Sequence, residues 1–451
     1  MGVLPLDSEI LGAQFGTAEM RALFGEKAQL QVMLDVEVAL ARALARFGLV
    51  PEHVTRAIER AARVENLDLK ELAESARMVG HPVVGLVREL GRAAGEEAAR
   101  YIHWGATAQD ILDTAMVLQI RQAAALVRRD LVGLACALAD KARRFRDTPM
   151  AGRTHLKQAV PITFGLKCAT WAAPLPAHIE RLDQACRRLA VVQFGGAAGT
   201  LAALGSQGLA VLEALADDLG LGVPDAPWHT VRDGFAEMVA VLGLICGSLG
   251  KFAFDVMLLG QSEVGEVAEP YREGRGGSST MPQKRNPVAS EHVLAACHIV
   301  PSLVAAMLGA MIQDHERARG LWQSEPLILP QCFVLSAGAL AQARTVAEGM
   351  TVDPARMLRN LQCEGGLIMA EALATHLTPA LGRRAAHEAV ERLCQRTQAE
   401  RRSLGEAISQ EPELIRQLGG ADVSRLTDPT CYLGSAATFV DRIVARIAKL
   451  A

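Results

Sequence analysis

Residues 276–287 (GGSSTMPQKRNP) carry the side chains best suited to chemistry on an anion. Glycines allow close backbone approach and left-handed conformations, and hydroxyls such as those of Ser278 and Ser279 can donate to carboxylate oxygens. Lys284 supplies positive charge where negative charge would develop in a transition state, and Asn286 adds an amide. The stretch is therefore a candidate anion-binding loop, and a polar linker with incidental basic residues is the alternative.

This stretch resembles the signature loop of the fumarase/aspartase superfamily, which includes adenylosuccinate lyase, argininosuccinate lyase and 3-carboxymuconate cycloisomerase. The resemblance implies that Ser278 is the catalytic base and that Lys284 and Asn286 hold a substrate carboxylate. Ser279 is expected among the substrate contacts. No His, Cys, Asp and Glu spacing here is typical of a metal site, so we expect neither metal nor cofactor.

A second motif is Thr154-His155, in the run GRTHLKQAVP. An imidazole that titrates near neutrality suits proton transfer, although a lone histidine before a helix is more often structural. The resemblance implies that His155 acts as general acid or as part of the proton relay, with Thr154 contacting substrate. It also implies that Glu291, thirteen positions after Ser278, orients the imidazole within hydrogen-bond reach in the assembled protein.

A third motif, HWGATAQD at residues 103–110, resembles the loop that binds a substrate carboxylate in this superfamily. We expect Thr107, Gln109 and Asp110 to contact substrate. Ala108 stands where a serine is common, so one hydroxyl donor is missing. Asp110 could equally cap the long helix that follows it.

Three further residues are weaker candidates for substrate contact. His81 matches the place of an active-site histidine in adenylosuccinate lyases, and Arg317 matches an arginine that can reach substrate. Gln193 begins a glycine-rich loop at 193–200. This loop lacks a preceding strand and a lysine, which excludes a nucleotide-binding P-loop.

The composition favours helices and leaves a small anionic substrate possible, because local charge decides what binds. Half of the 451 residues are hydrophobic and only 4% are aromatic, a mix typical of closely packed helices. A net charge of -3 excludes a strongly basic nucleic-acid surface. Nine cysteines at irregular spacing, without a signal peptide, indicate reduced thiols in a cytoplasmic protein. Residues 293–313 carry no Asp, Glu, Lys or Arg, which we interpret as a buried bundle helix and not a membrane span.

The elements that must position these motifs are long helices. Apolar residues recur at helical spacing from residue 30 to 47, in a small N-terminal domain. Long helical stretches follow at about 111–146, 161–193, 230–262, 288–315 and 328–349, and Pro174, Pro176 and Pro301 should kink or end their helices. We therefore predict an all-α fold of three helical domains, 1–110, 111–350 and 351–451. The resemblance implies a homotetramer with a twenty-helix core, whose active sites each draw their three motifs from three subunits.

Two enzymatic functions and one structural function remain open. The retained His155 and Glu291 favour a lyase that eliminates from a succinyl-type substrate and releases fumarate. The segments at 19–43, 227–233 and 315–322 look most like 3-carboxy-cis,cis-muconate cycloisomerases, which close a lactone. A non-catalytic structural member is disfavoured, because the predicted catalytic residues are all present. The expected partner is a small dicarboxylate or tricarboxylate, with no nucleic acid and no membrane.

Overall fold

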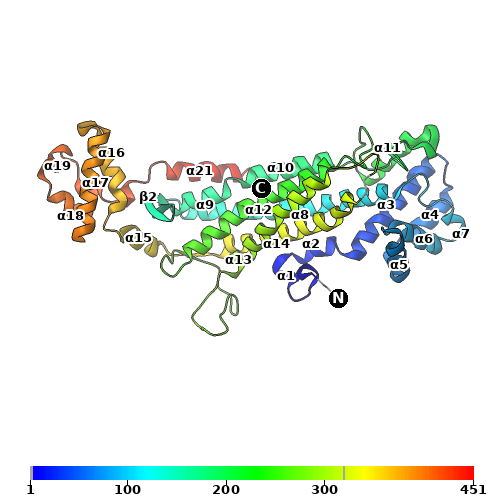
Figure 1. The fold of residues 1–451 in the computed structure, drawn as a ribbon, viewed down its shortest axis with the longest axis horizontal. Helices are drawn as coiled ribbons and strands as arrows, with labels where there is room; N and C mark the ends of the chain where they lie inside the picture. The colour runs from blue at the N-terminus through cyan, green and yellow to red at the C-terminus, as the bar shows by residue number, and fades with distance from the viewer. Residues whose placement is uncertain (1–3, 318–319, 451) are drawn as a thin grey trace. The chain divides into compact units, whose positions relative to one another are not determined.

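The computed structural model describes residues 4–317 and 320–450 and is almost entirely helical (Figure 1). The predicted all-α class is confirmed, because the described residues contain only four short strands in two small sheets. The α-helices are α1 (Gly12–Phe15), α2 (Ala18–Leu23), α3 (Glu26–Arg46), α4 (Glu52–Ala61), α5 (Leu69–Val79), α6 (Val83–Ala94), α7 (Glu96–Ala99), α8 (Ala108–Arg144), α9 (Phe164–Ala172), α10 (Leu175–Leu189), α11 (Gly208–Leu219), α12 (Asp233–Leu259), α13 (Val288–Ala310), α14 (Glu325–Gly349), α15 (Pro354–Gln362), α16 (Ala370–Leu381), α17 (Arg383–Glu400), α18 (Leu404–Ser409), α19 (Pro412–Gln417), α20 (Val423–Leu426) and α21 (Ala436–Ile447).

The chain forms two compact units, each assembled from three separate segments. Unit 1 comprises Met1–Asp130, Ala177–Gly247 and Ala295–Ala341, and unit 2 comprises Leu131–Pro176, Ser248–Leu294 and Gln342–Ala451. The long helices α8, α12, α13 and α14 contribute residues to both units. The three-domain division at residues 110 and 350 stays a prediction.

The core of unit 1 forms around α3, whose apolar stripe packs against α11. Leu34, Leu40 and Leu44 recur at helical spacing and are at most 1% exposed. Burying a leucine side chain stabilises the fold by about 1.5–3 kcal/mol. Phe47, which the pattern had included, follows the last residue of α3 and is exposed.

The predicted long helices exist close to the predicted bounds, except between residues 161 and 193. There the chain forms α9 and α10 with a break at Ala173-Pro174, because proline cannot donate a helical hydrogen bond. Pro176 lies in the first turn of α10, where it is tolerated. Pro301, by contrast, lies inside α13, which continues past it to Ala310.

The Thr154-His155 motif lies on a β-hairpin in unit 2 that sequence patterns did not reveal. Strands β1 (Pro149–Thr154) and β2 (Lys157–Thr163) pair antiparallel. The two residues between them, His155 and Leu156, have φ of 51° and 63°. Such a two-residue turn normally uses Asn-Gly. His155 and Leu156 are not typical of it, so the sequence does not predict the turn.

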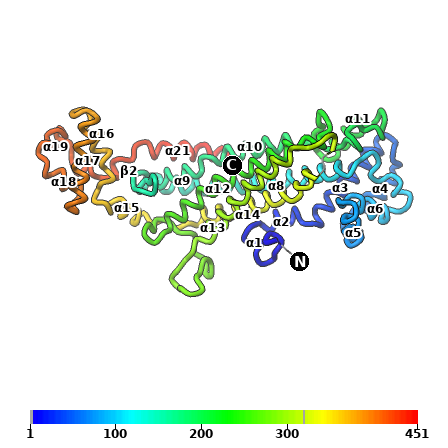
Figure 2. The backbone as a smooth tube through the Cα atoms, in the orientation of Figure 1, coloured from blue at the N-terminus to red at the C-terminus, as the bar shows by residue number. Residues whose placement is uncertain are grey.

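A second small sheet in unit 2 precedes the signature loop. Strand β3 (Val267–Ala268) pairs antiparallel with β4 (Thr351–Val352). The loop at 271–287 then leaves the flanking helices α12 and α13 as a long excursion, drawn in light green below their labels (Figure 2). The loop is therefore held at its start by a strand pair and at its end by α13.

Three helices are long and apolar enough, by length and composition alone, to cross a membrane: Asp233–Leu259, Val288–Ala310 and Leu321–Gly349. The most apolar windows of the first and third are 61% and 67% buried within the chain, whereas only 28% of the window in Val288–Ala310 is buried. Helix α13 is therefore an apolar helix that this single chain leaves largely uncovered.

Candidate functional site

Asp110 binds the protein's own backbone. The carboxylate is 1% exposed and accepts from the backbone N–H groups of Thr107, Gly195 and Gly196 at 2.9, 3.0 and 2.9 Å. Its Oδ1 also lies 2.6 Å from Nε2 of His229. Helix α8 begins at Ala108, so Asp110 lies in its first turn and not at the N-cap position that was one of its two expected roles. From there its carboxylate accepts from the N–H of Thr107, which directly precedes the helix. The other bonds order the glycine-rich loop beside it.

The amides of Gln109 and Gln193 are buried in the same network. Gln109 donates to Oδ2 of Asp113 at 3.1 Å and to the carbonyl of His229 at 2.8 Å. Gln193 accepts from the backbone N–H of Trp228 at 2.9 Å. Both side chains thus connect segments of the protein to one another. Their contact with substrate stays a prediction.

Arg317 joins the third motif to the glycine-rich loop. Its Nη1 donates to Oγ1 of Thr107 at 3.0 Å, and its Nη2 donates to the carbonyl of Ala197 at 3.0 Å. The hydroxyl of Thr107 therefore accepts from a cation. This half-buried pair, predicted from separate parts of the sequence, lies together within unit 1 and can bind an anion.

His81 lies close enough to this cationic group to be affected by it. Burial lowers its pKa below the usual 6.5, and the nearby charges of His103 and Arg317 lower it further. Its Nδ1 is buried and makes no hydrogen bond within the described structure. A neutral imidazole with an available ring nitrogen can accept or donate one hydrogen bond to a ligand.

His103 is a feature of the site that sequence reasoning passed over. Its Nδ1 lies 2.6 Å from Oε1 of Glu37, whose side chain is fully buried. Burial opposes the charged imidazole, but the hydrogen bond and the charge of Glu37 outweigh it and raise the pKa of His103 above 6.5. Its position at the start of the third motif was the signal that the sequence offered, and the structure adds a φ of 63°. Backbone strain of this kind is concentrated at functional sites.

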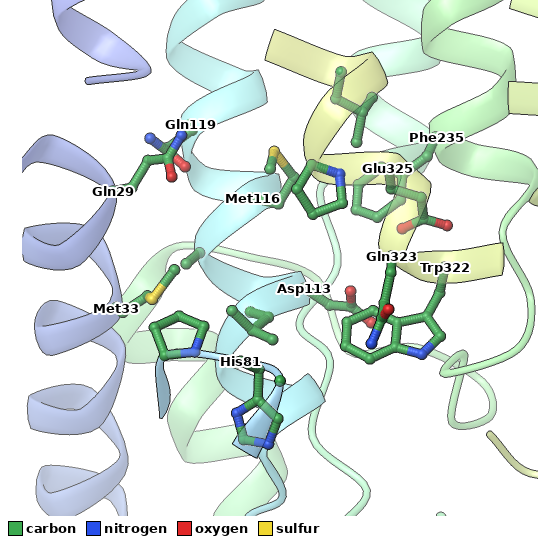
Figure 3. A pocket seen from close by; sticks show the side chains of 16 residues that line it. Gln29, Met33, His81, Asp113, Met116, Gln119, Phe235, Trp322, Gln323 and Glu325 are labelled. Carbon is green, nitrogen blue, oxygen red and sulfur yellow. The ribbon is translucent and has the colours of Figure 1, made fainter. Parts of the chain in front are cut away.

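A cavity of about 400 Å³ in unit 1 extends from His81. Figure 3 shows His81 at one end and Met33, Met116, Phe235 and Trp322 among the side chains around it. Most of the lining is apolar. The cavity is therefore poorly suited to a multiply charged anion, which fits the group of Thr107 and Arg317 better.

A buried ion-pair network supports this end of unit 1. Arg232 is fully buried and donates to both oxygens of Asp113 at 2.7 and 2.9 Å, and to Glu325 at 2.9 Å. Its guanidinium also lies 5.2 Å and 4.8 Å from the ring centroids of Trp228 and Phe235. Burial raises the pKa of Glu325, and the carboxylates raise that of Arg232 despite its burial. The sequence showed these residue types but not their pairing.

The predicted catalytic residues Ser278, Lys284, His155 and Glu291 all lie in unit 2. The Oγ of Ser278 accepts from the backbone N–H groups of Thr280 and Met281 at 3.2 and 3.0 Å. Two such donors favour the deprotonated oxygen that a serine base requires. Lys284 and Ser279 are exposed, and Asn286 is half-buried at the base of the loop.

The base of the signature loop is closed by the backbone. The N–H of Asn286 donates to the carbonyl of Gly276 at 2.8 Å, and residues 277 and 285 form an isolated antiparallel bridge. The guanidinium of Arg285 lies 4.1 Å from the ring centroid of Tyr271. Gly276 has φ of 67°, and a Cβ there would lie 2.5 Å from the carbonyl oxygen of Asn286. Only glycine fits this position without a shift of the backbone.

His155 and Glu291 are both exposed in the single chain. Across residues 4–317 and 320–450, no hydrogen bond joins their side chains. Thr154 is likewise exposed at the end of β1. The predicted pairing in an assembled protein therefore stays a prediction.

Comparison with known proteins gives the family. The family described as "Lyase" matches residues 14–301, and "Adenylosuccinate lyase C-terminus" matches residues 366–443. A 3-carboxy-cis,cis-muconate cycloisomerase of Pseudomonas aeruginosa is 50% identical over 97% of this chain and 96% of its own length.

The crystal structure of 3-carboxy-cis,cis-muconate lactonizing enzyme from Pseudomonas putida superposes with a TM-score of 0.93 at 45% identity, covering 98% of this chain and 100% of that one. A structure of fumarate lyase from a Mesorhizobium species has a TM-score of 0.90 at 44% identity, covering 96% and 98%. This chain belongs to the fumarase/aspartase superfamily, in the branch that resembles adenylosuccinate lyase, and it is an enzyme of that superfamily.

Proposed function

We propose that this protein is a 3-carboxy-cis,cis-muconate cycloisomerase. The observation that carries the proposal is its identity of 45–50%, over nearly the full chain, to relatives that bear this name. The residues alone had favoured a fumarate-releasing lyase, and the relatives favour the cycloisomerase over it. Retention of the signature loop disfavours a purely structural role.

The proposed reaction is an isomerisation in which no atom is lost. One carboxylate oxygen of the substrate forms a C–O bond to an alkene carbon. The electron pair of that C=C bond moves toward the carbon beside another carboxylate and gives an aci-carboxylate. One proton then adds to this carbon, and the product is a lactone.

In the proposed assembly, where the three motifs of each site come from different subunits, the candidate residues would have the following roles. Ser278, which would remove the proton in an elimination, donates it here, and its two backbone N–H contacts stabilise the serine oxygen afterwards. Lys284, Asn286 and Thr107 stabilise the aci-carboxylate. His155 donates from its ring to orient the attacking carboxylate, and Glu291 fixes its tautomer. Arg317 holds a further carboxylate of the substrate.

A lyase that releases fumarate is the second candidate function. An elimination needs an acid to protonate its leaving group, and a lactonisation does not, because the attacking carboxylate is already ionised. The presence of both His155 and Glu291 favours this candidate. A relative titled fumarate lyase, at 44% identity, belongs to the same family.

We further propose that the enzyme is a cytoplasmic homotetramer whose copies cover α13. Ile299 and Leu308 on this helix are 47% and 52% exposed, and the window around them is strongly apolar. Exposed apolar surface of this extent is typical of an interface. Light scattering should give four times the mass of 48.1 kDa, and a monomer would contradict the assembly.

The function is tested by following the ultraviolet absorbance of 3-carboxy-cis,cis-muconate after enzyme is added. Rapid loss with lactone formed is the expected result. Ser278→Ala should lower kcat by on the order of 10³-fold or more, while circular dichroism and mass stay unchanged. Absence of turnover by the wild type, with fumarate released from a succinyl-type amine, would assign the lyase instead.

A further inference from the structure

We propose that Glu266 and Glu269, which flank strand β3, are positioning residues for His155 and Glu291. The inference rests on the proposed function only in taking His155 and Glu291 as groups that touch substrate or each other. The residues concerned all lie in unit 2. Neither glutamate reaches substrate in this proposal, because each acts through a neighbouring element.

Glu266 fixes the hairpin that carries His155. Its side chain is fully buried, and its two oxygens accept from Nη1 and Nη2 of Arg153 at 2.9 and 2.6 Å. Arg153 stands two residues before His155, at the end of β1. A bidentate guanidinium–carboxylate pair fixes both position and orientation, so it sets where the strained turn at His155 and Leu156 projects.

The same carboxylate connects the hairpin to α15. Nδ2 of Asn360 donates to Oε1 of Glu266 at 2.7 Å. The carbonyl of Asn360 in turn accepts from Nε2 of Gln158, on the other strand of the hairpin, at 2.8 Å. Both strands are therefore attached to one buried carboxylate. An exposed hairpin tip with an immobile base can present a side chain to a neighbouring copy without losing its geometry.

Glu269 fixes the helix that carries Glu291. Its oxygens accept from the backbone N–H groups of Ala289 and Ser290 at 3.1 and 2.7 Å, and from Oγ of Ser290 at 2.7 Å. These N–H groups belong to the first turn of α13, which has no helical partners for them. Ser290 directly precedes Glu291, so the position of this turn sets the position of the Glu291 carboxylate.

Strand β3 is itself held in place. It pairs with β4, and the N–H of Asp353 donates to the carbonyl of Glu266 at 3.0 Å. Two predicted site elements, far apart in sequence, are thus anchored to one four-residue segment. That segment also leads into the signature loop, so β3 is a common base for three parts of the candidate site.

The kinetic test is a double-mutant cycle with the full-length enzyme. Glu266→Gln should lower kcat by on the order of 10²-fold, since small misplacements of reacting groups have effects of this size, with KM changed by less than about threefold. In a His155→Gln background the same substitution should change kcat by less than about twofold, because a residue that acts through His155 has nothing left to position. Glu269→Gln should likewise lower kcat on its own, and should change kcat by less than about twofold in a Glu291→Gln background.

The matched control is Asp441→Asn. Asp441 makes a bidentate pair with Arg146 at 2.8 Å for both contacts, also in unit 2 but exposed. This variant should keep wild-type kcat. If Glu266→Gln does not fold, Arg153→Met with Glu266→Met removes the ion pair without leaving a buried charge, and should keep the fold but lose kcat. Multiplicative losses in the cycle, or a kcat of Glu266→Gln within twofold of wild type, would overturn the proposal.

Hydrogen exchange tests the anchoring without any substrate. Backbone amides of residues 150–163 should exchange faster in Glu266→Gln, and those of residues 288–294 faster in Glu269→Gln, with neither change in Asp441→Asn. Unchanged exchange in both segments would refute the anchoring. If wild-type enzyme fails to consume 3-carboxy-cis,cis-muconate, the cycloisomerase function fails, while this exchange measurement still decides the role of the two glutamates.

Discussion

The guanidinium of Arg317 donates to the hydroxyl of Thr107 at 3.0 Å, across 210 positions of sequence. If this pair binds a substrate carboxylate, Arg317→Ala should raise KM by about tenfold or more, because a charge-assisted hydrogen bond contributes about 1.5–3 kcal/mol. Arg128, whose ion pair with Asp183 is exposed, is the control: Arg128→Ala should leave KM unchanged. Initial-rate kinetics on both variants check this, and equal KM values in the two variants would count against an anion site at Arg317.

The contact between His103 and Glu37 predicts a pH dependence of stability. The pKa of His103 is raised in the folded protein, so folded His103 holds its proton more tightly than the unfolded chain does. The stability that protonated His103 contributes to the fold is complete below its unfolded-state pKa of 6.5. It is lost as the pH rises through the pKa of the folded state. Wild type should therefore exceed Glu37→Gln in Tm by about 2–4 °C near pH 6, and the gap should narrow toward pH 9. A gap that is constant or widens over this range would contradict the assignment.

Among the charged residues of unit 1, Arg232 should be the one whose substitution lowers the free energy of unfolding most. Arg232→Met would leave Asp113 and Glu325 as buried carboxylates without a cation, which costs about 3–5 kcal/mol of folding free energy. Combining it with Asp113→Asn and Glu325→Gln should restore part of that loss. Denaturant unfolding measures the loss in Arg232→Met and its partial recovery in the triple variant. Arg188→Met removes an exposed pair with Glu237 and should leave stability unchanged, so similar losses at Arg188 and Arg232 would argue against this account.

Gly276, at the start of the signature loop, and Gly274, two residues before it, form a matched pair. Both have positive φ, 67° and 77°, but a Cβ at Gly276 meets the carbonyl of Asn286 at 2.5 Å, whereas one at Gly274 meets nothing within 4 Å. Gly276→Ala should open the base of the loop and lower kcat by about tenfold or more, with little change in Tm, since the loop is exposed. Gly274→Ala should lower kcat much less, and equal effects would show that backbone strain alone is responsible.

The sequence predicted the helices and much of the candidate residue set. Helical periodicity placed α8 and α12 within a few residues of their bounds, since apolar side chains of such helices must lie on packed faces. The hairpin at residues 149–163 could not be predicted, because its turn uses His155 and Leu156 in place of asparagine and glycine. The hydrogen-bond partners of Asp110 could not be predicted either. Nothing local in the sequence indicates that a carboxylate will accept from backbone N–H groups of a loop 85 positions away.

The bonds of Asp110 also bear on how the protein folds. The loop at Gly195 and the ring of His229 lie 85 and 119 positions from Asp110 in sequence. Such contacts form only after long stretches of chain have been brought together, at an entropic cost that grows with their separation. Helix α8 can form early from its local propensity, but the network at its first turn requires α10 and α12 to be in place. The glycine-rich loop at 193–200, which Arg317 connects to Thr107, should therefore be among the last parts of unit 1 to order during refolding. Activity should return after helical structure does.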